Sequence, residues 1–333
     1  MSSPFLSVIT PVYNDEEYIE ECIKSVLAQT RGDFEYIVCN NNSTDRSGEI
    51  ARDLAASDPR MRVVSPPELL PQAKNFNFAL GQMSPNAKYC KMLSSDDWLF
   101  PECLEKMTAL AEANPSVGLV SAYRLIEAAP DCFGVPVERT VFPGKEALRW
   151  QLLGEAFPFG TPSTVMYRAD LVREALPLFF PEGRFYFDLD AAFRILSKSD
   201  FGFVHQILSF SRYQPGAIMD LASHLHTWAV MHFVLVHDYG RDYLSAEEFT
   251  RRHAKVQSEL YLKLGEAWLK DRVRPTKVEL WEFQRKQLRS VGEDIRTHLL
   301  ARGALDAAVT LLSNPGLLLG DIRRGLSKAK PRV

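Results

Sequence analysis

The fold is decided by residues 5–42, which read FLSVITPVYNDEEYIEECIKSVLAQTRGDFEYIVCNNN. Phe5 to Thr10 is a short run rich in β-branched residues, and we expect it to form a strand that Pro11 stops. Apolar residues then recur at helical spacing over residues 16–29, and a second apolar run spans residues 36–39. Because both runs are continuously apolar, we expect two buried parallel strands that the helix joins as a right-handed crossover.

The same alternation of strand and helix signals continues along the first part of the chain. We expect further helices over residues 46–56 and 74–82, and further strands over residues 61–64 and 89–93. The middle of the chain mixes short strands (117–120, 165–167, 203–204) with many prolines and one strong helix (189–198). The sequence therefore predicts an α/β fold with a mostly parallel sheet that is flanked by helices.

The last part of the chain shows helix signals without the alternating strand signals of the first part. Helical periodicity dominates after residue 220, over the ranges 222–239, 246–270, 276–300 and 304–312. We expect an α/β domain over residues 1–218 and a helical C-terminal extension over residues 219–333. Large aromatic residues of the extension, such as Trp228 and Trp281, are interpreted as core or interface residues, so an oligomer formed through these helices is a further expectation.

The composition excludes some classes of function. The 333 residues carry a formal charge of −3, whereas general nucleic-acid binding favours basic surfaces. The five cysteines are odd in number, lack metal-ligand spacing and mostly have apolar neighbours, which favours reduced thiols in a core. The N-terminus has no basic, apolar leader, and the longest apolar run, residues 228–236, is too short to cross a bilayer. We therefore expect a cytoplasmic protein.

Polar segments follow three of the expected strands. They read TPVYND at residues 10–15, NNNSTDRS at residues 40–47 and SSDD at residues 94–97. Because the ligands of an open α/β sheet bind beyond the carboxyl ends of its strands, these segments are candidates for one site. Tyr13 offers a ring on which a base can stack, and the asparagine amides can both donate and accept hydrogen bonds. The alternative is that these residues only cap the helices that follow them.

Asp96 and Asp97 form the most informative pair in these segments. Side-by-side carboxylates at a strand end supply the hard oxygen ligands that divalent cations prefer. A cation in this place can neutralise a diphosphate. The alternative is a turn with a helix-capping acid, before the helix that we expect to begin at Pro101 and Glu102.

In this order and at these separations, the three segments and the pair Lys74–Asn75 resemble the nucleotide-binding half of family 2 glycosyltransferases, which have the GT-A fold. The resemblance covers residues 5 to about 110 and resumes weakly between about 160 and 218. It implies a GT-A catalytic domain in which residues 1–110 bind a nucleotide-sugar donor and residues 111–218 form the acceptor side. The implied donor is by default a UDP-sugar, and the implied acceptor is a glycan or a lipid-linked molecule.

The resemblance, carried over by position, also implies the residues of the donor site. These are Pro11, Tyr13, Asp15, Asn40, Asn41, Lys74, Asn75, Ser95 and Asp96. Asp96 matches the metal-binding acid of the family's Asp-x-Asp motif, which implies Mg²⁺ or Mn²⁺ as the cofactor. Asp97 is a further candidate, better suited to orienting the turn or the donor. For Lys74 the alternative is a solvated position on its helix.

Residues 185–194, which read FYFDLDAAFR, resemble the acceptor-side motif of the family. The resemblance makes Asp188 the general base of an inverting transfer, which takes the proton of the acceptor hydroxyl as that oxygen attacks the anomeric carbon. The alternative is that Asp188 caps the N-terminus of the helix that follows. Asp190 is the reserve candidate for the base.

Three positions depart from the family pattern. Asn40 stands in place of the acid that usually holds the base of the nucleotide, so the identity of that base is open. Ser94 replaces the first acid of the Asp-x-Asp motif. Gln214 stands where the family often has histidine, in a segment whose Arg212 is a further candidate for the donor site. We therefore expect weak binding of Mg²⁺ or Mn²⁺ that becomes visible mainly with donor present.

Two other functions compete with sugar transfer. A degenerate family member that binds nucleotide or a partner without transfer is favoured by the three altered positions. A nucleotidyltransferase that makes the activated sugar needs a glycine-rich basic loop after its first strand, and PVYN at residues 11–14 is unlike one. Separately, the basic tail at residues 321–333 suits peripheral contact with the inner face of a membrane, the alternative being a solvated terminus.

Overall fold

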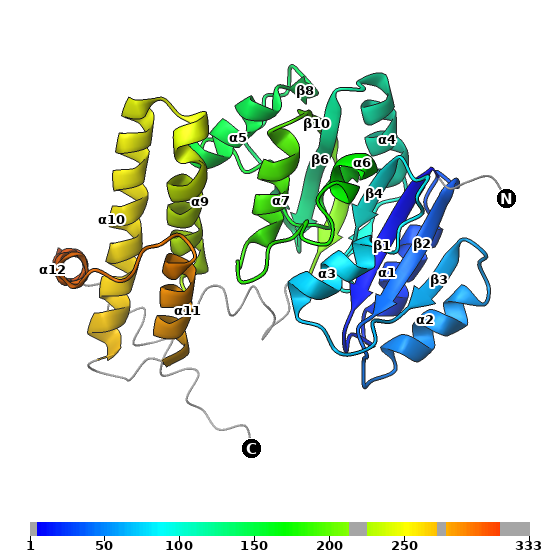
Figure 1. Cartoon of the computed structure of the whole chain (residues 1–333), viewed down its shortest axis with the longest axis horizontal. Helices are drawn as coiled ribbons and strands as arrows, with labels where there is room; N and C mark the ends of the chain where they lie inside the picture. The colour runs from blue at the N-terminus through cyan, green and yellow to red at the C-terminus, as the bar shows by residue number, and fades with distance from the viewer. Residues whose placement is uncertain (1–4, 213–224, 272–277, 314–333) are drawn as a thin grey trace. The chain divides into compact units, whose positions relative to one another are not determined.

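The computed structural model describes residues 5–212, 225–271 and 278–313. The chain divides into two compact units, residues 1–215 and residues 216–333. Figure 1 shows that the first unit combines helices with a sheet and that the second is helical. The mixed α/β fold, its flanking helices and the helical C-terminal region that the sequence predicts are therefore confirmed.

The first unit is built on one ten-stranded sheet. Its strands are β1 (Leu6–Val12), β2 (Phe34–Asn40), β3 (Met61–Val64), β4 (Tyr89–Met92), β5 (Trp98–Leu99), β6 (Val117–Ile126), β7 (Ala129–Asp131), β8 (Val141–Phe142), β9 (Met166–Arg168) and β10 (Asp200–Ser211). The order across the sheet is β3-β2-β1-β4-β9-β6-β10-β5, with β7 beside β6 and β8 beside β10. Strands β1 to β4 pair in parallel, as do β6 and β10, whereas β9 runs antiparallel between β4 and β6.

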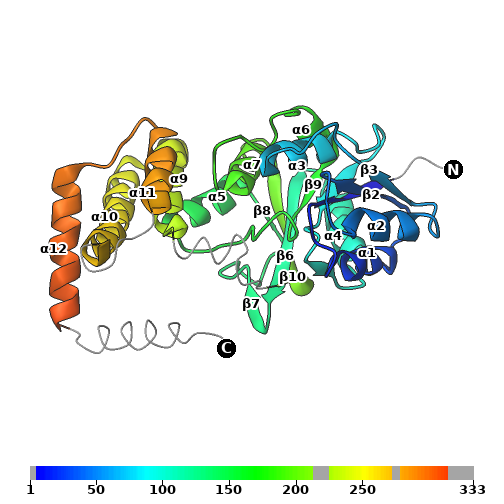
Figure 2. The same ribbon diagram turned by 90° about the horizontal axis from the view of Figure 1, so that it is seen from below.

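Helices cover both faces of this sheet. They are α1 (Ile19–Leu27), α2 (Ser47–Ala55), α3 (Gln72–Leu80), α4 (Cys103–Ala113), α5 (Gly144–Leu153), α6 (Ala169–Arg173) and α7 (Phe187–Leu196). Figure 2 shows α1, α2 and α4 on one face, and α3, α6 and α7 on the other. The buried side of α1 carries Ile19, Cys22, Ile23 and Val26, the spacing of one helix face. All five cysteines are buried free thiols, as expected.

Strand β1 continues through Pro11, which the sequence was expected to place at the end of the strand. Pro11 lies opposite Cys39 of β2, and the strand ends only at Val12. The pairing of β1 with its other neighbour, β4, stops at Ile9. Pro11 has no N–H to donate, but it lies beyond the last residue of β1 that pairs with β4. The sheet therefore loses no hydrogen bond at the proline. The strand therefore ends two residues later than expected, at Val12 and not at Thr10.

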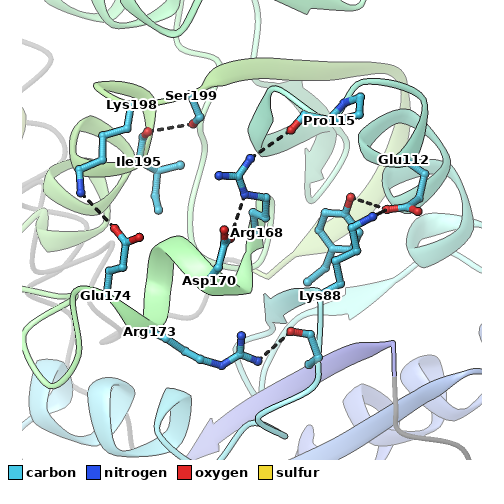
Figure 3. Close-up of polar contacts among 12 residues, drawn as sticks. Lys88, Glu112, Pro115, Arg168, Asp170, Arg173, Glu174, Ile195, Lys198 and Ser199 are labelled. Carbon is cyan, nitrogen blue, oxygen red and sulfur yellow. Dashed lines mark hydrogen bonds and ion pairs between the residues drawn. The ribbon is translucent and has the colours of Figure 1, made fainter.

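Two arginines, Arg168 and Arg173, fix the connection between β9 and α6 through hydrogen bonds (Figure 3). Arg168 donates to Asp170 at 2.8 Å and to the carbonyl oxygen of Pro115 at 3.1 Å. Arg173 donates to the carbonyl oxygens of Ser84 and Ala87, both at 2.7 Å. These contacts hold the short strand β9 and helix α6 against the chain that precedes β4 and against the end of α4.

The described residues of the second unit form helices α9 (Thr227–Tyr243), α10 (Ala246–Asp271), α11 (Val278–Arg289) and α12 (Thr297–Ser313). The single helix that we expected over residues 276–300 is wrong, because the chain leaves α11 at Arg289 and passes Gly292 with a φ of +75°. Helices α10 and α12 approach closely at two glycines: a Cβ on Gly303 would lie 2.0 Å from the carbonyl oxygen of Tyr261, and one on Gly265 would lie 2.3 Å from the backbone nitrogen of Ala304. Within the described ranges, no helix combines the length and the apolar character that crossing a membrane requires.

Candidate active site

The three polar segments meet at one edge of the sheet, because β1, β2 and β4 run parallel and end there. Segment 10–15 joins segment 40–47 through Asn14, whose N–H donates to the Ser43 hydroxyl at 3.1 Å and whose carbonyl oxygen Oδ1 accepts from the Thr44 N–H at 2.7 Å. Segment 10–15 joins segment 94–97 through a hydrogen bond between the side chains of Asp15 and Ser95. The convergence expected from the sequence is thus present in the structure.

The polar residues of the first two segments shape loops rather than cap helices. The N-cap positions of α1 and α2 are Tyr18 and Arg46, and neither side chain makes a capping hydrogen bond, so none of the expected residues stands at an N-cap position. Asn14 and Asn42 instead adopt left-handed backbone conformations with φ of +51° and +56°, which asparagine tolerates better than most residues. The Asp45 carboxylate accepts hydrogen bonds from the N–H groups of Glu16 and Ser47, which ties the two loops together.

The two asparagines that were expected to face a base are already engaged within the protein. Asn41 exchanges two hydrogen bonds with the backbone of Leu70, both at 2.9 Å, and so holds the loop before α3. The Oδ1 atom of Asn40 accepts from the N–H of Ser43 at 3.1 Å, and only 7% of Asn40 is exposed. A Cβ on Gly48 would lie 2.5 Å from Nδ2 of Asn40, which shows how tightly α2 starts against this residue.

Tyr13, Lys74 and Asn75 differ in how open they are to a ligand. Tyr13 is 47% exposed, so its ring is accessible beside the strand ends. Lys74 is exposed and its Nζ atom lies 3.5 Å from the carboxylate of Glu182. Asn75 is buried, and its Oδ1 atom accepts from the Cys39 thiol at 3.4 Å. Lys74 therefore faces solvent, whereas Asn75 packs against the end of β2.

Asp96 and Asp97 occupy different environments. Asp97 is 6% exposed and accepts hydrogen bonds from the hydroxyls of Ser163 and Ser211 and from the N–H of Arg212. Asp96 is only partly buried; burial, and next the charge of Asp97, raise its pKa to about 6. Helix α4 has Glu102 at its N-cap position, so the alternative that either acid caps this helix is wrong.

Arg212, which directly follows β10, contacts the turn that carries Asp96 and Asp97. Its guanidinium lies between two rings, 4.6 Å from the centroid of Tyr18 and 4.7 Å from that of Trp98. Its Nε atom donates to the carbonyl oxygen of Asp96 at 3.1 Å, and it forms an ion pair with Glu21. A cation between two rings is stabilised by both. Arg212 therefore contacts the Asp96 backbone, while Gln214 lies outside the residues that the structure describes, as does the basic tail over 321–333.

Asp188 lies in the first turn of α7, inside the helix. The N-cap position belongs to Tyr186, so the expectation that Asp188 is the N-cap is wrong. Its carboxylate accepts from the N–H groups of Asp188 itself and Leu189, and burial raises its pKa to about 6. Asp190, the reserve candidate, is instead held by Arg184 through contacts of 3.1 Å and 3.0 Å.

Two buried cations beside the acid pair were not identified from the sequence. Lys91 of β4 is fully buried, and Arg124 of β6 is 6% exposed. The signal that could have revealed Lys91 is a charged residue in the middle of an otherwise apolar strand; Arg124 lies near the end of its strand and gives no such signal. The structure places both cations next to residues that bind Asp97.

The carboxylate oxygens at the strand ends can bind a divalent cation only together with oxygen atoms of a bound ligand. Among the described residues, no three histidine, cysteine, aspartate or glutamate side chains gather into a metal cluster. The charge of Asp96 nevertheless helps to raise the pKa of Asp15, although burial is the larger cause. A cation would relieve this repulsion, and diphosphate oxygens would complete its ligands. The residues present therefore fit a metal that is shared with a diphosphate.

Comparison with known proteins agrees with this geometry. The sequence model of glycosyl transferase family 2 matches residues 7–176, which is just over half of the chain. An uncharacterized glycosyltransferase of Bacillus subtilis, EpsJ, is 39% identical over 112 residues, which cover 33% of this chain and 31% of EpsJ. An uncharacterized glycosyltransferase of Haemophilus influenzae is 30% identical over 175 residues, 51% of this chain and 54% of that protein. The chain thus matches about half or less of the length of these relatives.

Two solved structures share the fold. TarS of S. aureus, residues 1–349 in complex with UDP-GlcNAc, superposes with a TM-score of 0.57 at 19% identity, covering 86% of this chain and 80% of TarS. The mannosyltransferase PcManGT of Pyrobaculum calidifontis, in complex with GDP-Man and Mn²⁺, superposes with a TM-score of 0.58 at 19% identity, covering 98% of this chain and 84% of PcManGT. The fold of the first unit is of the GT-A type. Since its sequence matches the family model over just over half of its length, the chain belongs to glycosyl transferase family 2.

Proposed function

We propose that the protein is an inverting glycosyltransferase that moves a sugar from a nucleotide-diphosphate donor to a glycan or lipid-linked acceptor. The observation that carries this proposal is the pair of carboxylates Asp96 and Asp188, on separate elements of one GT-A unit. Burial is the main cause that raises the pKa of each to about 6. A transferase needs two such groups, one beside the leaving diphosphate and one beside the attacking hydroxyl.

Asp188 is the proposed general base. With a pKa of about 6 it is mostly ionised at neutral pH, yet it binds a proton more strongly than an exposed aspartate. It removes the proton of the acceptor hydroxyl while that oxygen forms a bond to the anomeric carbon. The bond between this carbon and the diphosphate breaks, and the diphosphate leaves with the electron pair. Because the attack comes from the face opposite the leaving group, the configuration inverts.

Asp96 is the proposed ligand of Mg²⁺ or Mn²⁺, which would supply positive charge to the departing diphosphate. The Mn²⁺ bound with GDP-Man in the PcManGT structure supports this proposal. Asp97 is not proposed as a ligand, because Ser163, Ser211 and the Arg212 N–H already bind it. With one protein carboxylate as the principal ligand, metal binding should be weak without donor.

The exposed ring of Tyr13 is the proposed platform for the base of the nucleotide. UDP remains the default nucleotide, although TarS binds UDP-GlcNAc and PcManGT binds GDP-Man, so the fold accommodates either base in other proteins. Asn40 is buried as the last residue of β2, and its amide can donate to a base as well as accept from one. Calorimetric titration with UDP-, GDP-, CDP- and dTDP-sugars in the presence of MnCl₂ would identify the donor.

Two substitutions test the assigned roles. Asp188→Asn should leave donor affinity nearly intact and abolish transfer, whereas unchanged turnover would remove the base assignment. Asp96→Ala should abolish the Mn²⁺ dependence of donor binding, and equal affinity with and without Mn²⁺ in the wild type would remove the metal assignment. Asp53→Asn, at an exposed position of α2, is a matched control that should change neither property.

The second candidate function is nucleotide or partner binding without transfer. Asn40 and Ser94, which replace acids of the family pattern, favour it. This candidate predicts that a donor sugar binds with Mn²⁺ but is neither transferred nor slowly hydrolysed. A measurable release of nucleoside diphosphate by the wild type, lost in Asp188→Asn, decides for the transferase.

A further inference from the structure

Lys91 is a charged residue that no ligand can reach. It is fully buried in β4, opposite Met166 of β9. Its ammonium donates to the carbonyl oxygen of Ser163 at 2.8 Å and lies 3.4 Å from that of Val165. A buried ammonium costs several kcal/mol of solvation, and an apolar residue in its place is often neutral for stability or stabilising. The position of this cation therefore calls for a role other than stability.

Ser163 connects Lys91 to the acid pair. Its carbonyl oxygen accepts from Lys91, while its hydroxyl oxygen accepts from the N–H of Ser94 at 2.9 Å. The same hydroxyl forms a hydrogen bond with Asp97. A hydroxyl has one proton, and since the Ser94 N–H occupies an oxygen lone pair, that proton is left to be donated to the Asp97 carboxylate. One residue thus joins the buried ammonium to both ends of the turn 94–97.

Arg124 is joined to Asp97 through a second serine, Ser211. Its guanidinium forms an ion pair with Asp131 at 2.7 Å and donates to the Thr161 hydroxyl at 3.0 Å. It also donates to the Ser211 hydroxyl at 3.4 Å, and that hydroxyl in turn forms a hydrogen bond with Asp97. Here the cation itself occupies the hydroxyl oxygen, as the Ser94 N–H does in Ser163, and the Ser211 proton is left for the carboxylate. Asp97 is therefore held from two sides by the same kind of contact.

We propose that Lys91 and Arg124 are positioning residues, which hold the hydroxyls of Ser163 and Ser211 against Asp97 and thereby fix the turn that presents Asp96. The proposal rests on the function proposed for Asp96. It gives the second acid of the pair a role distinct from the first: Asp97 anchors the turn from inside, and Asp96 faces the donor. Groups that orient the first ligands of a metal commonly change affinity or activity by about 10- to 100-fold when they are removed.

The test compares Lys91→Met, Ser163→Ala and the double variant with the wild type. The probes are UDP and GDP, each titrated by calorimetry with and without MnCl₂. Lys91→Met should weaken the Mn²⁺-dependent nucleotide affinity by about 10- to 100-fold, because the serine loses the group that fixes it. It should leave the urea midpoint unchanged or higher. The double variant should bind nucleotide no more weakly than the weaker-binding single variant, because both substitutions interrupt the same chain of contacts.

Lys88→Met is the matched control, since Lys88 lies just before β4 and pairs on the surface with Glu112 at 2.5 Å (Figure 3). It should bind nucleotide like the wild type. Wild-type affinity in Lys91→Met, or losses that multiply in the double variant, would overturn the proposal. If Lys91→Met does not fold, Ser163→Ala with Ser211→Ala carries the test, because each should lower the same affinity.

A second readout separates this inference from the proposed function. Hydrogen exchange should be faster at the Ser94 amide in Lys91→Met than in the wild type, and unchanged in Lys88→Met, whether or not nucleotide binds. Absence of nucleotide binding by the wild type would count against the proposed function alone. Equal exchange rates at Ser94 in Lys91→Met and the wild type would overturn the positioning role.

Discussion

Asp190 is bound by both of its oxygens to the guanidinium of Arg184, at 3.1 Å and 3.0 Å, two residues beyond Asp188 on the same helix. The side chains of Asp190 and Arg184 are 7% and 12% exposed. Among the described residues, Asp188 forms no comparable ion pair and accepts only backbone N–H groups of its own helix turn. One acid of α7 is thus neutralised inside the fold, while the other keeps a raised pKa and the capacity to take a proton.

Asp188→Asn should abolish transfer while making the protein more stable at neutral pH. Since the pKa of folded Asp188 is raised to about 6 from an ordinary value of 3.8, its ionised form is less favourable in the folded than in the unfolded chain. Removing that charge should raise the free energy of unfolding by roughly 1–3 kcal/mol at pH 7.5. The gain should be full above about pH 6 and vanish below about pH 4, which urea titrations at several pH values would show. A destabilised variant at pH 7.5 would contradict this account.

The rate of transfer should fall in acid because Asp188 becomes protonated. With its pKa at about 6, kcat/KM should be constant near pH 7.5 and should drop about tenfold per pH unit below 6. The profile is best measured at saturating MnCl₂, so that the titration of Asp96 contributes little. A rate that stays flat down to pH 4.5 would show that the rate-limiting proton transfer does not involve this carboxylate.

Arg184→Met should destabilise the first unit strongly. The change removes the guanidinium that binds both oxygens of the buried Asp190 carboxylate, and breaking a buried ion pair from one side typically costs about 3 kcal/mol or more. Arg194→Met on the same helix is the matched control, because Arg194 is exposed and its loss should change the free energy of unfolding by less than about 0.5 kcal/mol. Equal losses in the two variants would mean that the ion pair contributes little in solution.

Gly303→Ala should destabilise the helical unit. An added Cβ would lie 2.0 Å from the carbonyl oxygen of Tyr261, so α10 and α12 would have to separate. Overpacking of this kind costs about 1–3 kcal/mol, which thermal unfolding followed by circular dichroism would detect. Gly32→Ala is the control, because nothing lies within 4 Å of the Cβ that it adds. A melting temperature of Gly303→Ala equal to that of the wild type would contradict the close approach.

Most of the sheet that carries the donor site could be predicted because its signals are local. Strand β3 has the bounds expected from its apolar run, and β1, β2 and β4 differ from the expected ranges by at most two residues at each end. The break between α11 and α12 was missed, since apolar periodicity persists through Gly292 and only the backbone conformation there shows the turn. Strands β6 and β10 are much longer than expected, because pairing with each other extends them beyond their apolar stretches.

The sequence by itself determined the α/β fold of the first unit, the helical second unit and the convergence of Asp15, Asn40 and Asp96 at one edge of a parallel sheet. These follow from the spacing of apolar residues and from the fact that parallel strands end on the same side. Only the tertiary structure decided what each polar group does: it engaged Asn41 with Leu70, bound Asp190 to Arg184, and buried Lys91 and Arg124 beside the serines that hold Asp97. The physical reason is that hydrogen-bond partners far apart in the chain meet only after folding, when burial makes each unpaired polar group costly.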